Sequence, residues 1–294
     1  MMQDTTANLA PTPGSTPTTN NIRLLVLDID GTIVGESNEI ERPVLDAIQA
    51  VQAKGIQVAI ATGRMYRSAL RFHQAIGSGL PLLSYQGAFI KDPSTGTVLR
   101  HWAVSQQSAL QLLDHFEQMD AQHLLSIHFY IDDQLYVREI TSETELYAER
   151  SGVDPIAVGD LRQFLLTDAT IAPTKILALS QEPDVIDRLL TDLRQRYTPA
   201  ELYFTKSVAT FFEAANPLVN KGVAVRYLAE ELLGLQADNV MTIGDNFNDV
   251  EMLEYARIGV AMGNAPAEVK AIAAWVAPEV EVNGAATAIE QFLL

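Results

Sequence analysis

Short, largely apolar runs without polar and apolar alternation constrain the fold of this chain most. The clearest are residues 22–27, 56–61 and 240–243. A strand that is apolar on both faces is typical of a parallel sheet covered by helices on both sides. Helical stretches supply the crossovers, as at 43–54, which begins at Pro43 and is followed by Gly55. We therefore predict an α/β fold with a Rossmann-like, doubly wound parallel sheet as its core.

The middle of the chain has a different pattern. Residues 126–131 and 134–138 alternate in polarity around a turn at Asp132-Asp133, which favours antiparallel strands. Helical segments and a further strand at 175–179 interleave with them. We therefore predict a separate α+β domain at 89–207, inserted into a first domain that is formed by 21–88 and 208–294.

The N-terminal stretch 1–20 is rich in Thr, Pro and Asn and contains no basic residue. It has no apolar stretch that could serve as a signal peptide, so we predict a disordered tail. No apolar run in the chain reaches the roughly 18 residues that a membrane-spanning helix needs. The sequence therefore predicts a soluble protein without a membrane partner.

Charge and cysteine content exclude several functions. The 294 residues include 37 acidic and 20 basic side chains, a net charge of −17, which repels nucleic-acid backbones and anionic lipid. The absence of cysteine excludes disulfides, thiolate metal sites and cysteine nucleophiles. We expect a cytoplasmic protein that does not bind nucleic acid.

Polar residues follow the predicted strands at the edge where an open parallel sheet binds its ligands. They are Asp28, Asp30, Thr62 and Asp245, and Lys221 opens a helix at the same rim. Each alone could be an ordinary turn, strand end or solvated lysine. Asp-x-Asp-Gly-Thr and Gly-Asp-x-x-Asn-Asp in this order, each after an apolar strand, arise together by chance in on the order of one chain in 10⁵. The set therefore predicts a functional site.

These residue types suit phosphoryl transfer. Four carboxylates at one rim repel each other unless a hard divalent cation lies among them, and Mg²⁺ is the natural choice. They are Asp28, Asp30, Asp245 and Asp249. Lys221 and Thr62 could then hold the phosphoryl oxygens while a carboxylate attacks phosphorus.

The same motifs resemble those of a known family. Asp28-Ile29-Asp30-Gly31-Thr32, Thr62-Gly63-Arg64, Lys221 and Gly244-Asp245-x-x-Asn248-Asp249 look like the four motifs of the haloacid dehalogenase superfamily. The stretch 259–265 (Gly-Val-Ala-Met-Gly-Asn-Ala) and the insert resemble its Cof-type subfamily IIB. The resemblance implies an Mg²⁺-dependent phosphatase of small phosphate monoesters, such as sugar phosphates or phosphorylated cofactors, that uses an aspartyl-phosphate intermediate. It also implies that the insert 89–207 is a mobile α+β cap domain and that 21–88 and 208–294 form the catalytic core.

The resemblance also implies roles for single residues. Asp28 would be the nucleophile and Asp30 the general acid/base, with Lys221 as the third catalytic residue. The implied metal ligands are Asp28, Asp30 through its main-chain carbonyl, and Asp245. The implied phosphate ligands are Thr62, Gly63, Lys221 and Asn248. Asp249 would lie behind them and orient Lys221 or a metal-bound water, and no organic cofactor is implied.

Two departures and two alternatives qualify this interpretation. Members of the family often have Asn-Gly-Ala at the place of Gln86-Gly87-Ala88, and Ser at the place of Asn220. A phosphomutase would need a second phosphate site in the cap, but the basic residues there are scattered, namely Arg100, Arg138, Arg150 and Arg162. A silent binding module would usually have lost a chemical residue, and the full set is present. The sequence leaves the substrate and the oligomeric state open.

Overall fold

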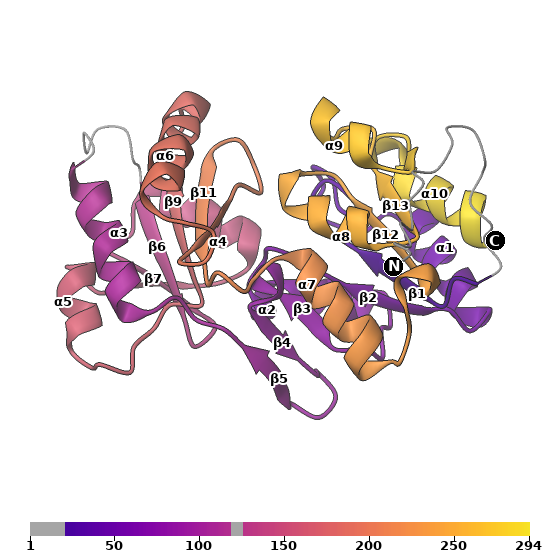
Figure 1. Ribbon diagram of the computed structural model, residues 1–294, viewed down its shortest axis with the longest axis horizontal. Helices are drawn as coiled ribbons and strands as arrows, with labels where there is room; N and C mark the ends of the chain where they lie inside the picture. The colour runs from indigo at the N-terminus through magenta and orange to yellow at the C-terminus, as the bar shows by residue number, and fades with distance from the viewer. Residues whose placement is uncertain (1–20, 119–125) are drawn as a thin grey trace, which may run out of the picture.

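The computed structural model describes residues 21–118 and 126–294, so the predicted disordered tail at 1–20 lies outside the described residues. Two lobes lie side by side (Figure 1). The first contains a five-stranded sheet in the order β14-β13-β12-β1-β2, and all its pairs are parallel. Its strands are β1 Leu24–Leu27, β2 Gln57–Ile60, β12 Val240–Gly244, β13 Ile258–Ala261 and β14 Trp275–Val276. The predicted parallel core is confirmed.

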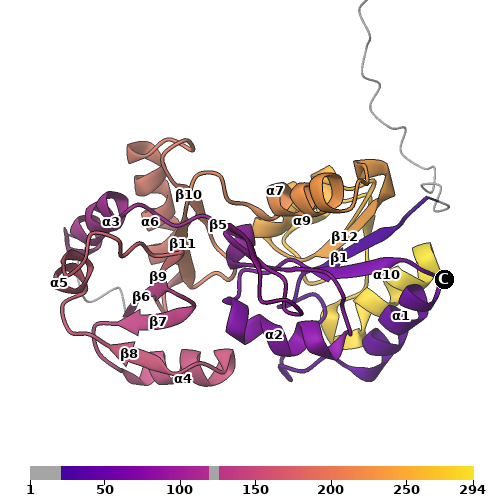
Figure 2. The same cartoon turned by 90° about the horizontal axis from the view of Figure 1, so that it is seen from below.

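Helices cover both faces of this sheet, as Figure 2 shows with α7 above the strands and α1 and α10 below them. The helices are α1 Arg42–Ala53, α2 Tyr66–Ala75, α7 Lys221–Arg226, α8 Val250–Tyr255, α9 Ala267–Ile272 and α10 Gly284–Leu293. In β1, Leu25 and Leu27 belong to the hydrophobic cluster that includes α1 and α10, whereas Leu24 and Val26 belong to the cluster that includes α7. Successive side chains of a strand point to opposite faces, so this apolar run is buried on both.

The second lobe is built on a separate six-stranded sheet in the order β10-β11-β9-β6-β7-β8, in which only β7 and β8 pair in parallel. The strands are β6 Ser126–Ile131, β7 Gln134–Val137, β8 Pro155–Ala157, β9 Lys175–Leu179, β10 Tyr203–Thr205 and β11 Phe211–Ala215. Its helices are α3 Gln106–Gln118, α4 Ser142–Ser151, α5 Leu161–Leu166 and α6 Pro183–Arg196. The predicted α+β insert is therefore present as a second sheet with its own helices.

The two faces of the cap sheet have different neighbours. In β9, Ile176 and Ala178 pack with α3, α5 and α6 in a cluster of their own. The alternate residues Leu177 and Leu179 face the core lobe and belong to the same cluster as the core strands. Figure 2 shows α4 at the lower edge of this lobe, away from α3 and α6. One face of the cap sheet therefore closes over the edge of the core sheet.

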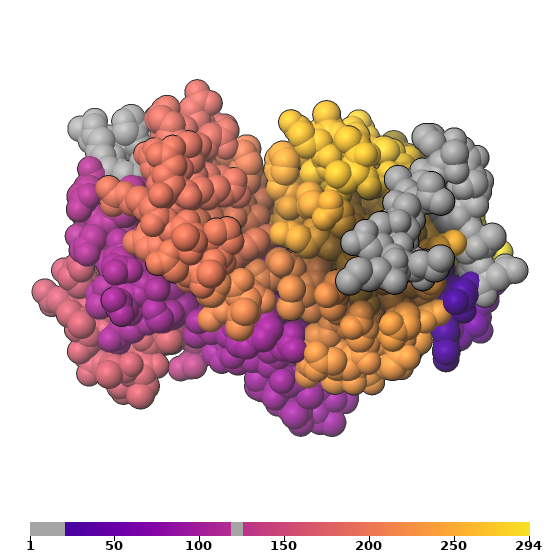
Figure 3. Space-filling view, in the orientation of Figure 1, coloured from indigo at the N-terminus to yellow at the C-terminus, as the bar shows by residue number. Residues whose placement is uncertain are grey.

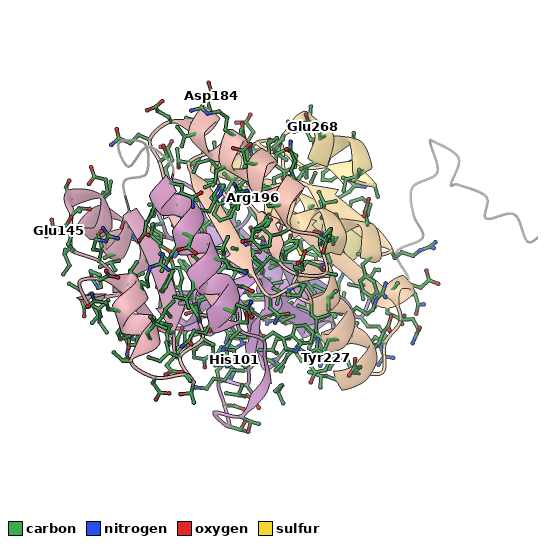
Figure 4. All side chains as sticks on the ribbon, turned by 60° about the vertical axis from the view of Figure 1, so that its left-hand side comes forward. His101, Glu145, Asp184, Arg196, Tyr227 and Glu268 are labelled. Carbon is green, nitrogen blue, oxygen red and sulfur yellow. The ribbon has the colours of Figure 1, made fainter. Side chains whose placement is uncertain are left out.

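A third, small sheet lies where the lobes meet and contains β3 Leu82–Ser84, β4 Phe89–Lys91 and β5 Val98–His101. Figure 4 shows His101, at the end of β5, near Tyr227 at the lower edge of the molecule. Arg100 lies over the rings of Trp102 and Tyr227, at 4.3 and 3.6 Å. The limits of the insert, residues 89 and 207, stay a prediction. Because β11 belongs to the cap sheet, strand pairing indicates that the chain returns to the core later than residue 207.

Within the described ranges, no helix is both long enough and apolar enough to span a bilayer.

A buried histidine of the cap gives the fold a predicted pH dependence. Burial lowers the pKa of His128 to about 3, with Lys175 adding to the effect, and neither ring nitrogen has a hydrogen-bond partner among the described residues. Below the ordinary pKa of 6.5, the unfolded chain binds a proton that the folded chain excludes. The free energy of unfolding should therefore fall by about 1.4 kcal/mol per pH unit as the pH drops from 6.5 towards 3.

The variant His128→Phe removes this titration and loses no hydrogen bond. Between about pH 7.5 and pH 5, wild type should lose about 2 kcal/mol of its free energy of unfolding through this titration. The variant should not show this loss. Urea unfolding at the two pH values measures the difference. Equal pH dependence in both proteins would show that His128 is not buried in its neutral form.

Candidate active site

The turn after β1 brings the first motif against a later strand. Asp28 is almost fully buried, and its N–H donates to the Ile243 carbonyl at 3.1 Å. Gly31 has a φ of +76°, and a Cβ there would lie 2.2 Å from Asp245 Oδ2, so only glycine allows this approach. Thr32 Oγ1 donates to Asp245 Oδ1 at 3.2 Å. The turn thus places Asp28 and Asp245 together at the carboxyl ends of β1 and β12.

Lys221 is fully buried and lies between two carboxylates. Its Nζ donates to Asp28 Oδ1 and to Asp249 Oδ1, both at 2.6 Å. It occupies the first turn of α7, where the Asn220 side chain caps the helix by accepting from the Val223 N–H at 2.7 Å. Asn220, one of the two departures from the family pattern, therefore performs the capping that a serine would perform.

Both oxygens of Asp249 already have partners. Oδ1 accepts from Lys221, and Oδ2 accepts the backbone N–H groups of Asp245 and Asn246 at 2.9 and 3.1 Å. Asp249 is fully buried. It therefore holds Lys221 and the Asp245 loop in place.

Three buried carboxylates form a candidate metal site. Ligand atoms of Asp28, Asp245 and Asp249 lie within 4.8 Å of one another, and Lys221 is the cation among them. Burial raises the pKa of Asp28 to about 7, with Lys221 opposing and Asp249 adding to the rise. Burial, Asp249 and Asp28 raise the pKa of Asp245 well above its ordinary value. This excess of negative charge fits a hard divalent cation with oxygen ligands.

The Asp30 side chain lies outside this group and is held by Arg64. Arg64 Nε and Nη2 donate to the two carboxylate oxygens at 2.8 and 2.7 Å, and Nη2 also donates to Asn38 Oδ1 at 2.9 Å. Burial raises the pKa of Asp30, but the hydrogen bonds and charge of Arg64 outweigh it and lower the pKa below the ordinary value. In this arrangement Asp30 is an ionised carboxylate close to Asp28.

Three of the predicted phosphate ligands, Thr62, Gly63 and Asn248, line one cavity, whereas the fully buried Lys221 is not among its lining residues. Thr62 Oγ1 accepts the Arg64 N–H at 3.1 Å, and a Cβ at Gly63 would lie 2.5 Å from Gln86 Nε2. Asn248 donates to Gln86 Oε1 at 3.2 Å, while its own Oδ1 is buried without a partner among the described residues. Gln86, the other departure from the family pattern, therefore packs directly against Gly63.

A cavity of about 550 Å³ lies between the lobes, which Figure 3 shows in broad contact. Its lining includes Asp28, Asp30, Thr62, Gly63, Asp245 and Asn248 from the core. The cap contributes Tyr147, Arg150, Lys175, Leu177, Phe211 and Glu213. This volume suits a small molecule enclosed by both lobes.

Sequence reasoning assigned no role to several residues of the site. Arg64 belonged to one of the motifs, but its pairing with Asp30 follows from the fold. Asn264 donates to the Gly31 carbonyl at 2.9 Å, and it lies in the motif at 259–265. Lys175 and Glu213 form a buried ion pair at 3.4 Å. The sequence feature that could have identified Lys175 is its position as a charged residue at one end of an apolar strand.

Comparisons with known proteins found a matching family model and relatives that cover most of the chain. The family model described as haloacid dehalogenase-like hydrolase matches residues 25–289. The 5-amino-6-(5-phospho-D-ribitylamino)uracil phosphatase YitU of Bacillus subtilis is 29% identical over 280 residues, which cover 92% of this chain and 97% of that protein. The pyridoxal phosphate phosphatase YbhA of Escherichia coli is 26% identical over 262 residues, covering 85% and 90%. The solved structure of the subclass IIB sugar phosphatase BT4131 has the same fold, with a TM-score of 0.77 at 20% identity over 92% of this chain and 98% of that chain.

Proposed function

The chain belongs to the haloacid dehalogenase-like hydrolases as a Cof-type, subfamily IIB phosphatase, and from this premise we propose an Mg²⁺-dependent reaction that proceeds through a phosphorylated Asp28. One observation carries the proposal. Asp28 is a buried carboxylate that lines the cavity, and its Oδ1 lies 2.6 Å from Lys221 Nζ. When a phosphate ester binds next to this carboxylate, the positive charge of Lys221 lies close to the phosphoryl group that is transferred.

The reaction has two steps on this chain. In the first, an Asp28 oxygen forms a bond to phosphorus, the bond to the leaving oxygen breaks, and Asp30 gives that oxygen a proton. In the second, Asp30 takes a proton from water, whose oxygen attacks phosphorus and releases Asp28. Lys221 and Thr62 hold the phosphoryl oxygens in both steps. Arg64 keeps Asp30 ionised in this arrangement, so the Asp30 carboxylate must separate from Arg64 before it can carry the transferred proton.

The metal site fits the ion that this chemistry needs. We assign Asp28, Asp245 and the main-chain carbonyl of Asp30 as ligands, with Asp249 behind them because both its oxygens are already bonded. Mg²⁺ supplies positive charge against the carboxylates and the phosphoryl oxygens.

The substrates we propose are small phosphate monoesters, namely sugar phosphates or phosphorylated cofactors. Support comes from the enclosed cavity and from YitU and YbhA, whose names specify phosphate esters of this size. A phosphomutase is less well supported, because Arg150 is the only one of the four scattered cap arginines that lines the cavity. The cytoplasmic location stays a prediction.

Asp30→Asn tests the two-step reaction. Turnover should fall by about 10² to 10⁴, since the variant keeps the nucleophile and loses the acid and base. With nitrophenyl phosphate, whose leaving group needs little protonation, the second step should suffer more than the first. A phosphoryl adduct should then accumulate on Asp28 and be visible by mass spectrometry after rapid acid quenching.

The matched control is Asp46→Asn, which removes an exposed carboxylate of α1 that pairs with Arg42 at the surface. It should turn over at the wild-type rate without an adduct. An adduct that maps to a serine or histidine would refute the aspartyl-phosphate mechanism.

A further inference from the structure

One side chain of the cap contacts Thr62-Gly63-Arg64, the loop of the core that we propose binds phosphate and call the phosphate loop. Lys175 is the first residue of β9, and like Leu177 it faces the core because side chains alternate along a strand. Its Nζ donates to the Gly63 carbonyl at 2.9 Å. The side chain is 4% exposed, so this contact between the lobes is shielded from water. The mechanism above assigns it no role.

The charge of Lys175 is compensated inside the same interface. Glu213, on the neighbouring strand β11, lies 3.4 Å from its Nζ, and the Tyr130 ring centroid lies 4.8 Å from it. Glu213 also accepts a hydrogen bond from Gln86 Nε2 at 3.1 Å and one from Ser207. A buried ion pair is weak evidence for a stabilising role, because desolvation offsets the attraction. Its hydrogen bonds do, however, give the Lys175 ammonium one geometry.

The Gly63–Arg64 peptide group links Lys175 to the phosphate site. Its carbonyl oxygen accepts from Lys175, and its N–H donates to Thr62 Oγ1 at 3.1 Å. Because a peptide group is planar, the direction of the carbonyl sets the direction of the N–H. With this N–H bound to its oxygen, the Thr62 hydroxyl must direct its proton elsewhere, and Thr62 lines the same cavity as Asp28.

We propose that Lys175 is a positioning residue that completes the phosphate site from the cap. It holds the Gly63–Arg64 peptide so that the Thr62 hydroxyl donates to the transferred phosphoryl group. The inference rests on the proposed phosphatase function. It adds that closure of the cap organises the phosphate loop as well as enclosing the leaving group.

The test compares two variants of the full-length protein. Lys175→Met/Glu213→Gln removes both buried charges together, whereas Glu213→Gln alone keeps the Lys175 donor to Gly63 and leaves its charge without the Glu213 partner. The double variant should have kcat/KM about 10² lower than Glu213→Gln, a usual effect of losing or misplacing one donor at a phosphoryl or oxyanion site. Lys91→Met, which changes a lysine over the Tyr66 ring and away from the cavity, should match wild type.

Two substrates separate positioning from recognition of the leaving group. The loss should be equal for acetyl phosphate and for pyridoxal phosphate, and inhibition by inorganic phosphate should weaken about tenfold. A loss confined to pyridoxal phosphate would overturn the proposal, because Lys175 would then contact the leaving group. A lower melting temperature with unchanged kcat/KM would overturn it in favour of a purely structural role.

A double-mutant cycle tests whether Lys175 acts through Thr62. In a Thr62→Ala background, the Lys175→Met/Glu213→Gln change should lower kcat/KM by less than about threefold, since the hydroxyl it positions is gone. Full additivity would refute the proposal. Failure of the function itself has a different signature, because wild type with Mg²⁺ would then release no phosphate from either substrate.

Discussion

Asp28→Asn should lower the turnover of every phosphate ester by about 10⁵-fold or more, because an amide cannot attack phosphorus as a carboxylate does. Asparagine has nearly the same shape as the aspartate that lies 2.6 Å from Lys221 in wild type, so the loss should come from chemistry rather than from misfolding. Phosphate release with Mg²⁺ from a panel of phosphate monoesters measures the effect. No phosphoryl adduct should form on this variant with any ester.

Folding gives the control for this variant. Asp28 lies in a group of carboxylates that repel one another, so its replacement should leave the metal-free protein at least as resistant to thermal unfolding as wild type. The substitution would still leave Lys221 paired with Asp249. Phosphate release at the wild-type rate by the folded variant would disprove the role of Asp28 as nucleophile.

Removal of divalent metal should abolish turnover, and Mg²⁺ should restore it. Among the described residues, Lys221 is the one cation that pairs with the carboxylates of Asp28 and Asp249 beside Asp245, and a phosphate dianion would add further negative charge. Ca²⁺ should substitute poorly, because its larger and looser coordination shell allows a carboxylate to bind through both oxygens. That binding mode would occupy the oxygen with which Asp28 attacks.

Thermal unfolding gives a second measurement that does not depend on activity. Mg²⁺ should raise the melting temperature of wild type, and this rise should be much smaller in Asp245→Asn, which loses one ligand. The exposed change Asp46→Asn should keep the full rise. Full turnover by thoroughly demetallated wild type would refute the metal assignment.

Some features of the fold could be read directly because their signals are local. A strand that is apolar on both faces indicates a parallel sheet, and Pro43 and Gly55 mark the two ends of α1. Other signals were present but not used. Thr141 caps the start of α4 and Gly152 ends it in a left-handed conformation, yet this helix was not among the predicted elements.

Elements of the cap were harder to predict for another reason. The strand β11 follows β10 along the chain but also pairs with β9, and nothing in its own five residues indicates that partner. The residues of a short strand indicate that it is buried, whereas the identity of the strand it pairs with depends on contacts far away in the sequence. The return from cap to core is therefore the least predictable limit of the fold.

The sequence by itself determined the parallel core and the place of Asp28, Thr62 and Asp245 at one edge of the sheet, because burial of both strand faces and the polar residues that follow are encoded within a few residues. Tertiary structure alone decided that Arg64 holds Asp30 and that Lys175 holds the Gly63 carbonyl. The latter pair is separated by 112 positions in the chain. Such contacts depend on how the two lobes meet, and no local pattern of hydrophobicity indicates how far apart two lobes lie or how they are oriented.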